Sequence, residues 1–321
     1  VIPWNYFCHY GDTTLLREHY QGMKHWVEYL QTRTDDKGIV VREEPNGWCL
    51  GEWSTPHNRI EIPASLVNTA YFYHVTCIMA DVAGILNKKN DEHHLRTLAE
   101  TIRKNFNAAF YNEATHHYGE GKQGADVFAL AFGLVPDGKR EKVFAALLGH
   151  LEKVNYHFDT GILATPLLLQ VLTENGRADL AYKLMNQRDF PSYGYLADKK
   201  NNTLWETWNG DGNDEGCGHC HPMFGSVVAW FYHSLAGIKP DQSDPGMKHF
   251  YIEPMIVPDL KYCRATYDSQ YGKISSDWKI DENGNLNIKI EVPANTSATV
   301  IIPDWGGRTV LESGKPVSEV S

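Results

Sequence analysis

One glycine-rich segment, Thr203 to His221, concentrates the side chains that could do chemistry. In it Glu206 lies between Trp205 and Trp208, and His221 closes the segment. Indole neighbours lower the local dielectric and favour a carboxyl group that works as a general base. Irregular loops between packed helices commonly carry such sites. The segment therefore predicts a candidate base at Glu206, whereas a surface glutamate beside two core tryptophans is the structural alternative.

The same segment ends in Cys217-Gly-His-Cys-His221, which matches the C-x-x-C-H pattern of covalent haem attachment. Its thiols and imidazoles are also possible zinc ligands. No second Cys/His pair in the sequence completes a tetrahedral zinc site. We therefore predict neither a metal nor another cofactor, and interpret Cys217 and Cys220 as incidental thiols near a functional His221.

Two further stretches combine aromatic and polar side chains. One runs from Gly47 through Glu52 and Trp53 to His57, and the other, Phe190 to Tyr195, contains Tyr193. Sugar rings stack their C–H faces on aromatic rings and offer hydroxyl groups to carboxylates and imidazoles. Carbohydrate is therefore the predicted ligand class. Trp4, Trp26 and Trp230 fall within helical patterns and are expected to fill helix contacts.

Apolar periodicity places these loops on a mainly helical chain with a β appendage. Apolar residues recur at helical spacing over about residues 12–31, 63–86, 91–110, 128–134, 143–151, 163–172, 180–185 and 223–235. Short polar turns join them into helical hairpins. Beyond about residue 248, alternating runs with the turn Asp281-Glu-Asn-Gly284 predict antiparallel strands. The domains expected are residues 1–245, helical, and 246–321, an antiparallel β-sandwich.

Composition narrows the classes of partner. The 321 residues include 42% apolar residues and carry a net charge of −10, with basic residues only in short clusters. A nucleic-acid surface is therefore not expected, and no run is apolar for long enough to cross a membrane. Six cysteines are too few for a disulfide scaffold. The start, Val-Ile-Pro-Trp, has no initiator Met, so we expect any targeting segment or upstream domain to lie outside these residues.

Ordered motifs along nearly the whole chain resemble the bacterial α-L-rhamnosidases of glycoside hydrolase family 78. The motifs are Tyr10-Gly-Asp12 through Tyr20, Ala70 to Tyr73, His157 to Thr165, Leu172 to Ala181, Phe190 to Tyr195, Thr203 to Trp208, His221 to Val227 and Leu235 to Ile238. The resemblance implies an (α/α)6 barrel followed by a β-sandwich. It also implies that Glu206 is the general base for an attacking water and that His221 touches the rhamnose.

The resemblance extends to other pocket residues, with two differences. Trp53 corresponds to the tryptophan of a Gly-Asp-Trp segment that lines the sugar pocket, but Glu52 stands where aspartate is usual. Tyr193 stands where tryptophan is common, on the aglycone side. With Trp205 beside the base, the residues expected to bind substrate are His221, Trp53, Glu52, Trp205 and Tyr193.

The motif that supplies the general acid of this inverting family normally lies upstream of the segment resembled by Pro3-Trp4, and these 321 residues do not contain it. Inversion needs two carboxyl groups about 6.5–9.5 Å apart. The helix count also falls about three short of twelve. We therefore expect a barrel that is incomplete at its N-terminal side, an acid supplied upstream of residue 1, and little or no rhamnoside hydrolysis by the 321 residues alone.

Two alternatives remain at this stage. The chain could belong to another (α/α)6 glycosidase, or to a homologue that binds carbohydrate without hydrolysing it. The upstream sequence would separate them, because an intact acid motif favours catalysis. The natural rhamnoside and the oligomeric state stay open, and a periplasmic or extracellular location is expected by analogy alone.

Overall fold

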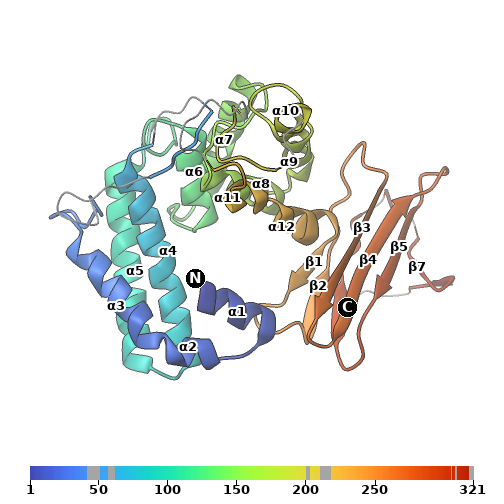
Figure 1. Cartoon of the computed structure of the whole chain (residues 1–321), viewed down its shortest axis with the longest axis horizontal. Coiled ribbons are helices and arrows are strands. Elements are labelled where there is room, and N and C mark those ends of the chain that lie inside the picture. Colours follow the sequence, from blue (N-terminus) through green and yellow to red (C-terminus); the bar gives the residue numbers. More distant parts are fainter. Residues whose placement is uncertain are drawn as a thin grey trace. The chain divides into compact units, whose positions relative to one another are not determined.

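The computed structural model describes residues 1–41, 51–56, 62–199, 203–209, 218–304, 306–307 and 309–317. The chain folds as two compact units, coloured along the sequence in Figure 1. The first consists of Val1–Phe7 and Asp12–Trp230, and the second of Cys8–Gly11 and Phe231–Ser321. Among the described residues, no helix is long and apolar enough to cross a membrane. The predicted fold class, mainly helical with a β appendage, is confirmed.

Helical hairpins build the first unit. Its elements are α1 (Ile2–Tyr10, whose end belongs to the second unit), α2 (Thr14–Glu18), α3 (Tyr20–Thr32), α4 (Ala64–Ile85), α5 (Lys89–Phe110), α6 (Gln123–Ala131), α7 (Arg140–Lys153), α8 (Ala164–Glu174), α9 (Ala178–Met185), α10 (Tyr193–Asp198), α11 (Pro222–Gly225) and α12 (Val228–Trp230). The pairs α4–α5, α6–α7 and α8–α9 pack as consecutive helices, and α6 also packs against α4 and α8. The predicted hairpins are therefore present.

Burial separates an inner set of helices from an outer one. Every residue of α6 from Gln123 to Leu130 is buried, which is typical of a helix covered on all sides. In contrast, α5 buries only Leu95, Ala99, Ile102 and Phe106, spaced three and four residues apart. A helix with a single buried stripe lies at the surface. The inner helices α4, α6 and α8 thus carry the core, and α8 begins next to the candidate site.

Two predicted helices are interrupted in the structure. The helix expected over residues 12–31 divides at His19 into α2 and α3. The helix expected over residues 223–235 becomes α11, α12 and a π-helical turn, Phe231–Leu235, in which the Ala236 N–H donates to the Phe231 carbonyl. Gly225 and Ser226 lie at the break between α11 and α12, and both residue types weaken a helix interior.

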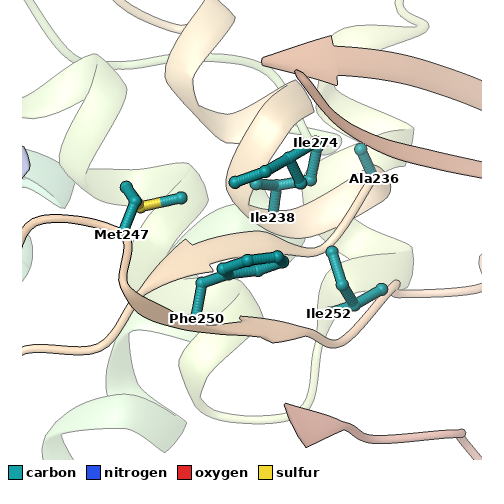
Figure 2. Packing of buried hydrophobic residues seen from close by; sticks show 6 residues of the cluster. All are labelled: Ala236, Ile238, Met247, Phe250, Ile252 and Ile274. Carbon is teal, nitrogen blue, oxygen red and sulfur yellow. The ribbon is translucent and has the colours of Figure 1, made fainter. Parts of the chain in front are cut away.

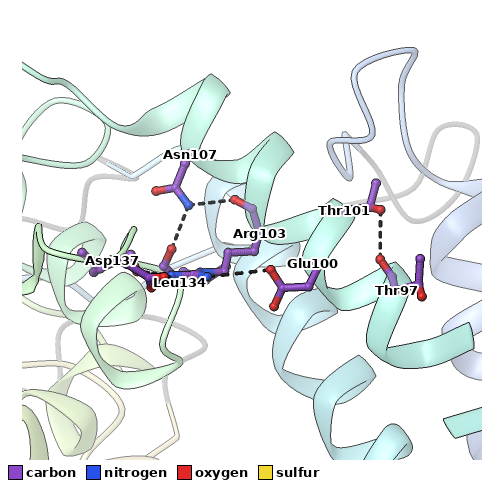
Figure 3. Close-up of polar contacts among 8 residues, drawn as sticks. Thr97, Glu100, Thr101, Arg103, Asn107, Leu134 and Asp137 are labelled. Atoms are coloured by element: carbon purple, nitrogen blue, oxygen red, sulfur yellow. Dashed lines mark hydrogen bonds and ion pairs between the residues drawn. The ribbon is translucent and has the colours of Figure 1, made fainter. Parts of the chain in front are cut away.

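Side chains on α5 fix the connection between α6 and α7, as Figure 3 shows. The Arg103 guanidinium donates to the Val135 carbonyl and to Asp137, both at 2.8 Å. The Asn107 amide donates to the Leu134 carbonyl at 2.7 Å. Buried carbonyl groups of a turn need such donors, because an unpaired polar group in the interior is costly. These contacts hold the second hairpin against the first.

The second unit is built from short strands. They are β1 (Ile238–Pro240), β2 (His249–Ile252), β3 (Tyr262–Ser269), β4 (Gly272–Ile280), β5 (Leu286–Glu291), β6 (Ser297–Val300), β7 (Leu311–Glu312) and β8 (Lys315–Pro316). Their orders within the sheets are β1-β2-β6, β3-β4-β5 and β7-β8. The pairing is antiparallel except between β2 and β6, which run parallel. The β4–β5 hairpin forms around the predicted Asn-Gly turn.

A small apolar core holds these strands together (Figure 2). It consists of Ala236, Ile238, Met247, Phe250, Ile252 and Ile274. Trp278 of β4 is also fully buried, and its indole N–H donates to the Leu235 carbonyl at 2.7 Å. Alternation along β2 points Phe250 and Ile252 inward and leaves His249 and Tyr251 partly exposed.

The position of Phe250 in this core predicts a large loss of stability on truncation. Phe250→Ala should lower the free energy of unfolding of the β unit by about 3–5 kcal/mol, because it removes a fully buried ring and leaves a cavity. Tyr262→Ala is the matched control: Tyr262 is 68% exposed, so its effect should stay within about 0.5 kcal/mol. Calorimetric unfolding of both variants measures this, and equal losses would contradict the assigned core.

Candidate active site

The segment from Thr203 to His221 folds back on itself, so that its two described ends lie together. The Glu206 N–H donates to the Gly218 carbonyl at 2.9 Å, and the His221 N–H donates to the Leu204 carbonyl at 2.8 Å. The Thr203 hydroxyl also donates to the His219 carbonyl. Residues 210–217, including Cys217, lie outside the described residues. Backbone pairing therefore brings Glu206 and His221 side by side although fifteen positions separate them in the sequence.

Two N–H groups orient the Glu206 carboxylate. The Gly218 N–H donates to Oε2 at 2.8 Å, and the Trp53 indole Nε1 donates to Oε1 at 3.4 Å. A carboxylate has about four lone-pair sites, so these two bonds leave acceptor capacity for a water molecule. The side chain is partly exposed. The geometry suits a fixed base that solvent can reach.

His221 lies near Glu206, beside the same glycine. A Cβ atom at Gly218 would lie 3.3 Å from the Glu206 Oε2 and 3.7 Å from the His221 Cδ2, so both side chains flank this glycine. The His221 Nδ1 is buried and has no hydrogen-bond partner among the described residues. The residue as a whole is partly exposed, so its second ring nitrogen, Nε2, is the atom through which the imidazole can exchange a hydrogen bond with a ligand.

Residues 52 and 53 approach from a different part of the chain. The Trp53 carbonyl accepts the Ile162 N–H at 3.2 Å, just before α8, while the indole reaches Glu206. This approach requires glycine at position 161, since a Cβ atom there would lie 1.9 Å from the Trp53 carbonyl oxygen. The start of α8 thus fixes the backbone of the residue whose side chain orients Glu206.

The structure places Glu52 differently from the sequence-based prediction. The sequence predicts a sugar contact, whereas the structure buries the Glu52 side chain completely. Its Oε1 accepts the Ala164 N–H at 3.0 Å, at the first residue of α8, and its Oε2 has no partner in the described part of the chain. Glu52 therefore points inward, to the start of α8, while the Trp53 indole reaches Glu206.

The other predicted aromatic residues lie around this centre. The Trp205 ring is stacked on His219, with their centroids 3.9 Å apart. Tyr193 donates its hydroxyl to the Phe224 carbonyl at 2.9 Å, and its ring meets Trp208 edge-on. Burial raises the pKa of Tyr193 well above its ordinary value, so the hydroxyl stays protonated as a donor. Tyr193 therefore belongs to an aromatic cluster under the loop.

The sequence did not reveal the contribution of Gly218, and it indicated Trp208 only as a neighbour of Glu206. Gly218 supplies a backbone N–H to Glu206, and Trp208 is anchored under the loop by its indole N–H, which donates to the Thr160 carbonyl at 2.9 Å. The glycine-rich composition of the loop was the available signal for the first. The position of Trp208 two residues after Glu206 was the signal for the second. His57, predicted near the site, lies outside the described residues.

Helical hairpins, a carboxylate-bearing loop and a following β unit define the class of helical-hairpin glycosidases. A family model described as the bacterial alpha-L-rhamnosidase 6 hairpin glycosidase domain matches residues 1–235. The model of the bacterial alpha-L-rhamnosidase C-terminal domain matches residues 237–315. The chain therefore belongs to the bacterial alpha-L-rhamnosidase family, as its sequence motifs predict.

Individual relatives agree with this family. An alpha-L-rhamnosidase of Formosa agariphila is 32% identical over 309 residues, which cover 94% of this chain and 33% of the relative. One of Streptomyces avermitilis is 34% identical, covering 94% and 29%. The chain thus spans about a third of the length of these curated relatives.

Solved structures show the same likeness. The structure of an alpha-L-rhamnosidase from Dictyoglumus thermophilum superposes with a TM-score of 0.90 at 34% identity, over 99% of this chain and 36% of that one. The Streptomyces avermitilis alpha-L-rhamnosidase complexed with L-rhamnose gives a TM-score of 0.84 at 33% identity, over 94% and 29%.

The buried Glu52 predicts a pH dependence of stability. Burial raises the pKa of its carboxyl group from 4.5 to about 8, although the N–H groups of Ala164, Gly161 and Leu163 lower it. Because the folded-state pKa exceeds the unfolded one, this contribution to stability is complete below about pH 4.5 and is lost as the pH rises to about 8. Glu52→Gln, which stays neutral, should therefore gain stability relative to the wild type over that range.

The gain should reach a few kcal/mol, and thermal unfolding of both proteins at a series of pH values measures it. A difference in stability that stays constant from about pH 5 to about pH 8 would show that Glu52 does not titrate in this range.

Proposed function

We propose that this chain carries the general base of an α-L-rhamnosidase, a glycoside hydrolase that removes terminal α-L-rhamnose with inversion. The observation that carries the proposal is the Glu206 carboxylate, which is held by the Trp53 indole and the Gly218 N–H and lies, like His221, beside Gly218. The likeness to a solved alpha-L-rhamnosidase complexed with L-rhamnose supports rhamnose as the sugar.

In the proposed reaction, Glu206 accepts a proton from a water molecule as that water attacks the anomeric carbon. The attack comes from the face opposite the leaving group, which inverts the configuration. A second carboxyl group protonates the leaving oxygen, and we propose that it comes from outside residues 1–321, in the part of the relatives that this chain does not cover. His221 and Trp53 hold the sugar, through a hydrogen bond and through the face of the indole.

The first test removes the base and keeps the shape. In the natural polypeptide, Glu206→Gln should lower kcat for an aryl α-L-rhamnoside by about 10³ or more, while L-rhamnose still binds, because an amide cannot accept the proton of the attacking water. Glu174→Gln, an exposed glutamate at the end of α8, is the control and should keep the wild-type rate. A near-normal rate for Glu206→Gln would remove this residue from the role.

The same assay tests the stereochemistry. Proton NMR of the first product formed should show β-L-rhamnose ahead of mutarotation, since a single displacement on an α-rhamnoside inverts the anomeric centre. Initial release of the α-anomer would point to a double displacement and would contradict a base at Glu206.

A second variant separates sugar binding from proton transfer. His221→Ala should weaken the binding of L-rhamnose by about tenfold, because it removes a hydrogen-bond partner from the sugar. Isothermal titration calorimetry measures the dissociation constant, with His94→Ala on the exposed surface of α5 as the control. An unchanged dissociation constant for His221→Ala would show that the imidazole has a structural role and does not bind the sugar.

A further inference from the structure

Glu52 is an unusual residue to find fully buried, because its charged form is costly in the interior. A buried carboxyl group stabilises a fold only when its oxygens are satisfied. Here Oε1 accepts the Ala164 N–H, but Oε2 has no partner among the described residues. A well-packed apolar side chain would serve packing better. The position of this carboxyl group therefore needs another explanation than stability.

The bond to Ala164 places the carboxyl group at the N-terminus of α8. The first N–H groups of a helix lack partners within the helix, and the residue before α8, Leu163, has no side-chain acceptor to offer. Glu52 supplies this acceptor from 112 positions away in the sequence. The partial positive charge of the helix end also favours a carboxyl group there.

The residue next to Glu52 is the one that touches the proposed base. The Trp53 carbonyl is bound by the Ile162 N–H, so residues 52 and 53 are joined to the same short segment, Gly161 to Ala164, by two hydrogen bonds. Two bonds fix the direction of the peptide between them. That direction sets where the Trp53 indole N–H meets the Glu206 Oε1.

We propose that Glu52 is a positioning residue for hydrolysis, which acts through Trp53 on Glu206 and does not contact the sugar. This inference rests on the proposed function. It assigns Glu52 the task of holding the indole at the angle from which its N–H orients the carboxylate. Loss of this orientation of the carboxylate lowers kcat, because a displacement of about 1 Å at a reacting group can reduce a rate about a hundredfold.

A double-mutant cycle in the natural polypeptide tests the proposal. Glu52→Met keeps the approximate length of the side chain but removes the oxygen that accepts the Ala164 N–H, and Trp53→Phe removes the indole N–H that Glu206 accepts. We expect Glu52→Met to lower kcat for an aryl α-L-rhamnoside by about tenfold or more, because the bond to the start of α8 is lost. In the Trp53→Phe background, the same substitution should change kcat by less than about twofold, because its effect passes through the indole.

Asp126→Asn is the matched control. Asp126 in α6 is also fully buried, but its carboxylate bonds to His117 and to the Tyr118 N–H rather than to the start of α8. This variant should lower the melting temperature yet keep kcat within about twofold of the wild type. If Glu52→Met does not fold, the cycle is run with Glu52→Asp, which keeps a carboxyl group but shortens its reach to the Ala164 N–H.

The outcomes separate this inference from the proposed function. If Glu206→Gln retains activity, the proposed function fails first. If Glu206→Gln is inactive, and the Glu52 substitution reduces kcat by the same factor with and without the indole N–H, then Glu52 acts by another route and the positioning role is overturned. An effect on KM alone, with kcat unchanged, would instead make Glu52 a determinant of sugar binding and would also overturn it.

Discussion

The close contact between residues 52–53 and the start of α8 is the constraint on which the rest of the site depends. A glycine at position 161 lets the Trp53 carbonyl reach the Ile162 N–H, and the Glu52 carboxyl group accepts the Ala164 N–H two residues further on. A helix end has N–H groups that must be satisfied, and here a distant loop satisfies them. The same bonds set the direction in which the Trp53 indole leaves the backbone, and therefore the orientation of the Glu206 carboxylate.

The start of α8 also holds the opposite side of the loop. The Thr160 carbonyl accepts the Trp208 indole N–H, and the Trp208 ring lies against Phe158 with centroids 5.1 Å apart. Because α8 is packed between α6 and α9, residues 160–164 at its start are held as rigidly as the helical core. Glu52, Trp53 and Trp208 come from separate stretches of sequence, but all three form hydrogen bonds to the same segment, residues 160–164. This arrangement explains how a glycine-rich loop can present a carboxylate in a defined direction.

The sequence predicts the elements well and the contacts between them poorly. Apolar periodicity identifies the hairpins from α4 to α9, and the concentration of indoles, glycine and histidine around Glu206 identifies the loop, because both signals are local. The burial of Glu52 is not local: its partner Ala164 is 112 positions away, and the Gly51-Glu-Trp53 pattern does not say which side chain points inward. Likewise, neither proline nor glycine stands at His19, where α2 and α3 are separated, so the sequence does not indicate this break. The N–H that Gly218 gives to Glu206 belongs to the backbone, which no residue pattern displays.

The most direct measurement of the central claim is a crystal structure of the natural polypeptide with L-rhamnose bound. The account predicts that the sugar lies against the Trp53 indole, with the His221 ring within hydrogen-bond reach and the Glu206 carboxylate facing the anomeric carbon across the width of about one water molecule. The Glu52 carboxyl group should remain bonded to the start of α8, without touching the sugar. L-rhamnose bound elsewhere, or bound without contact to the loop that carries Glu206, would contradict the account.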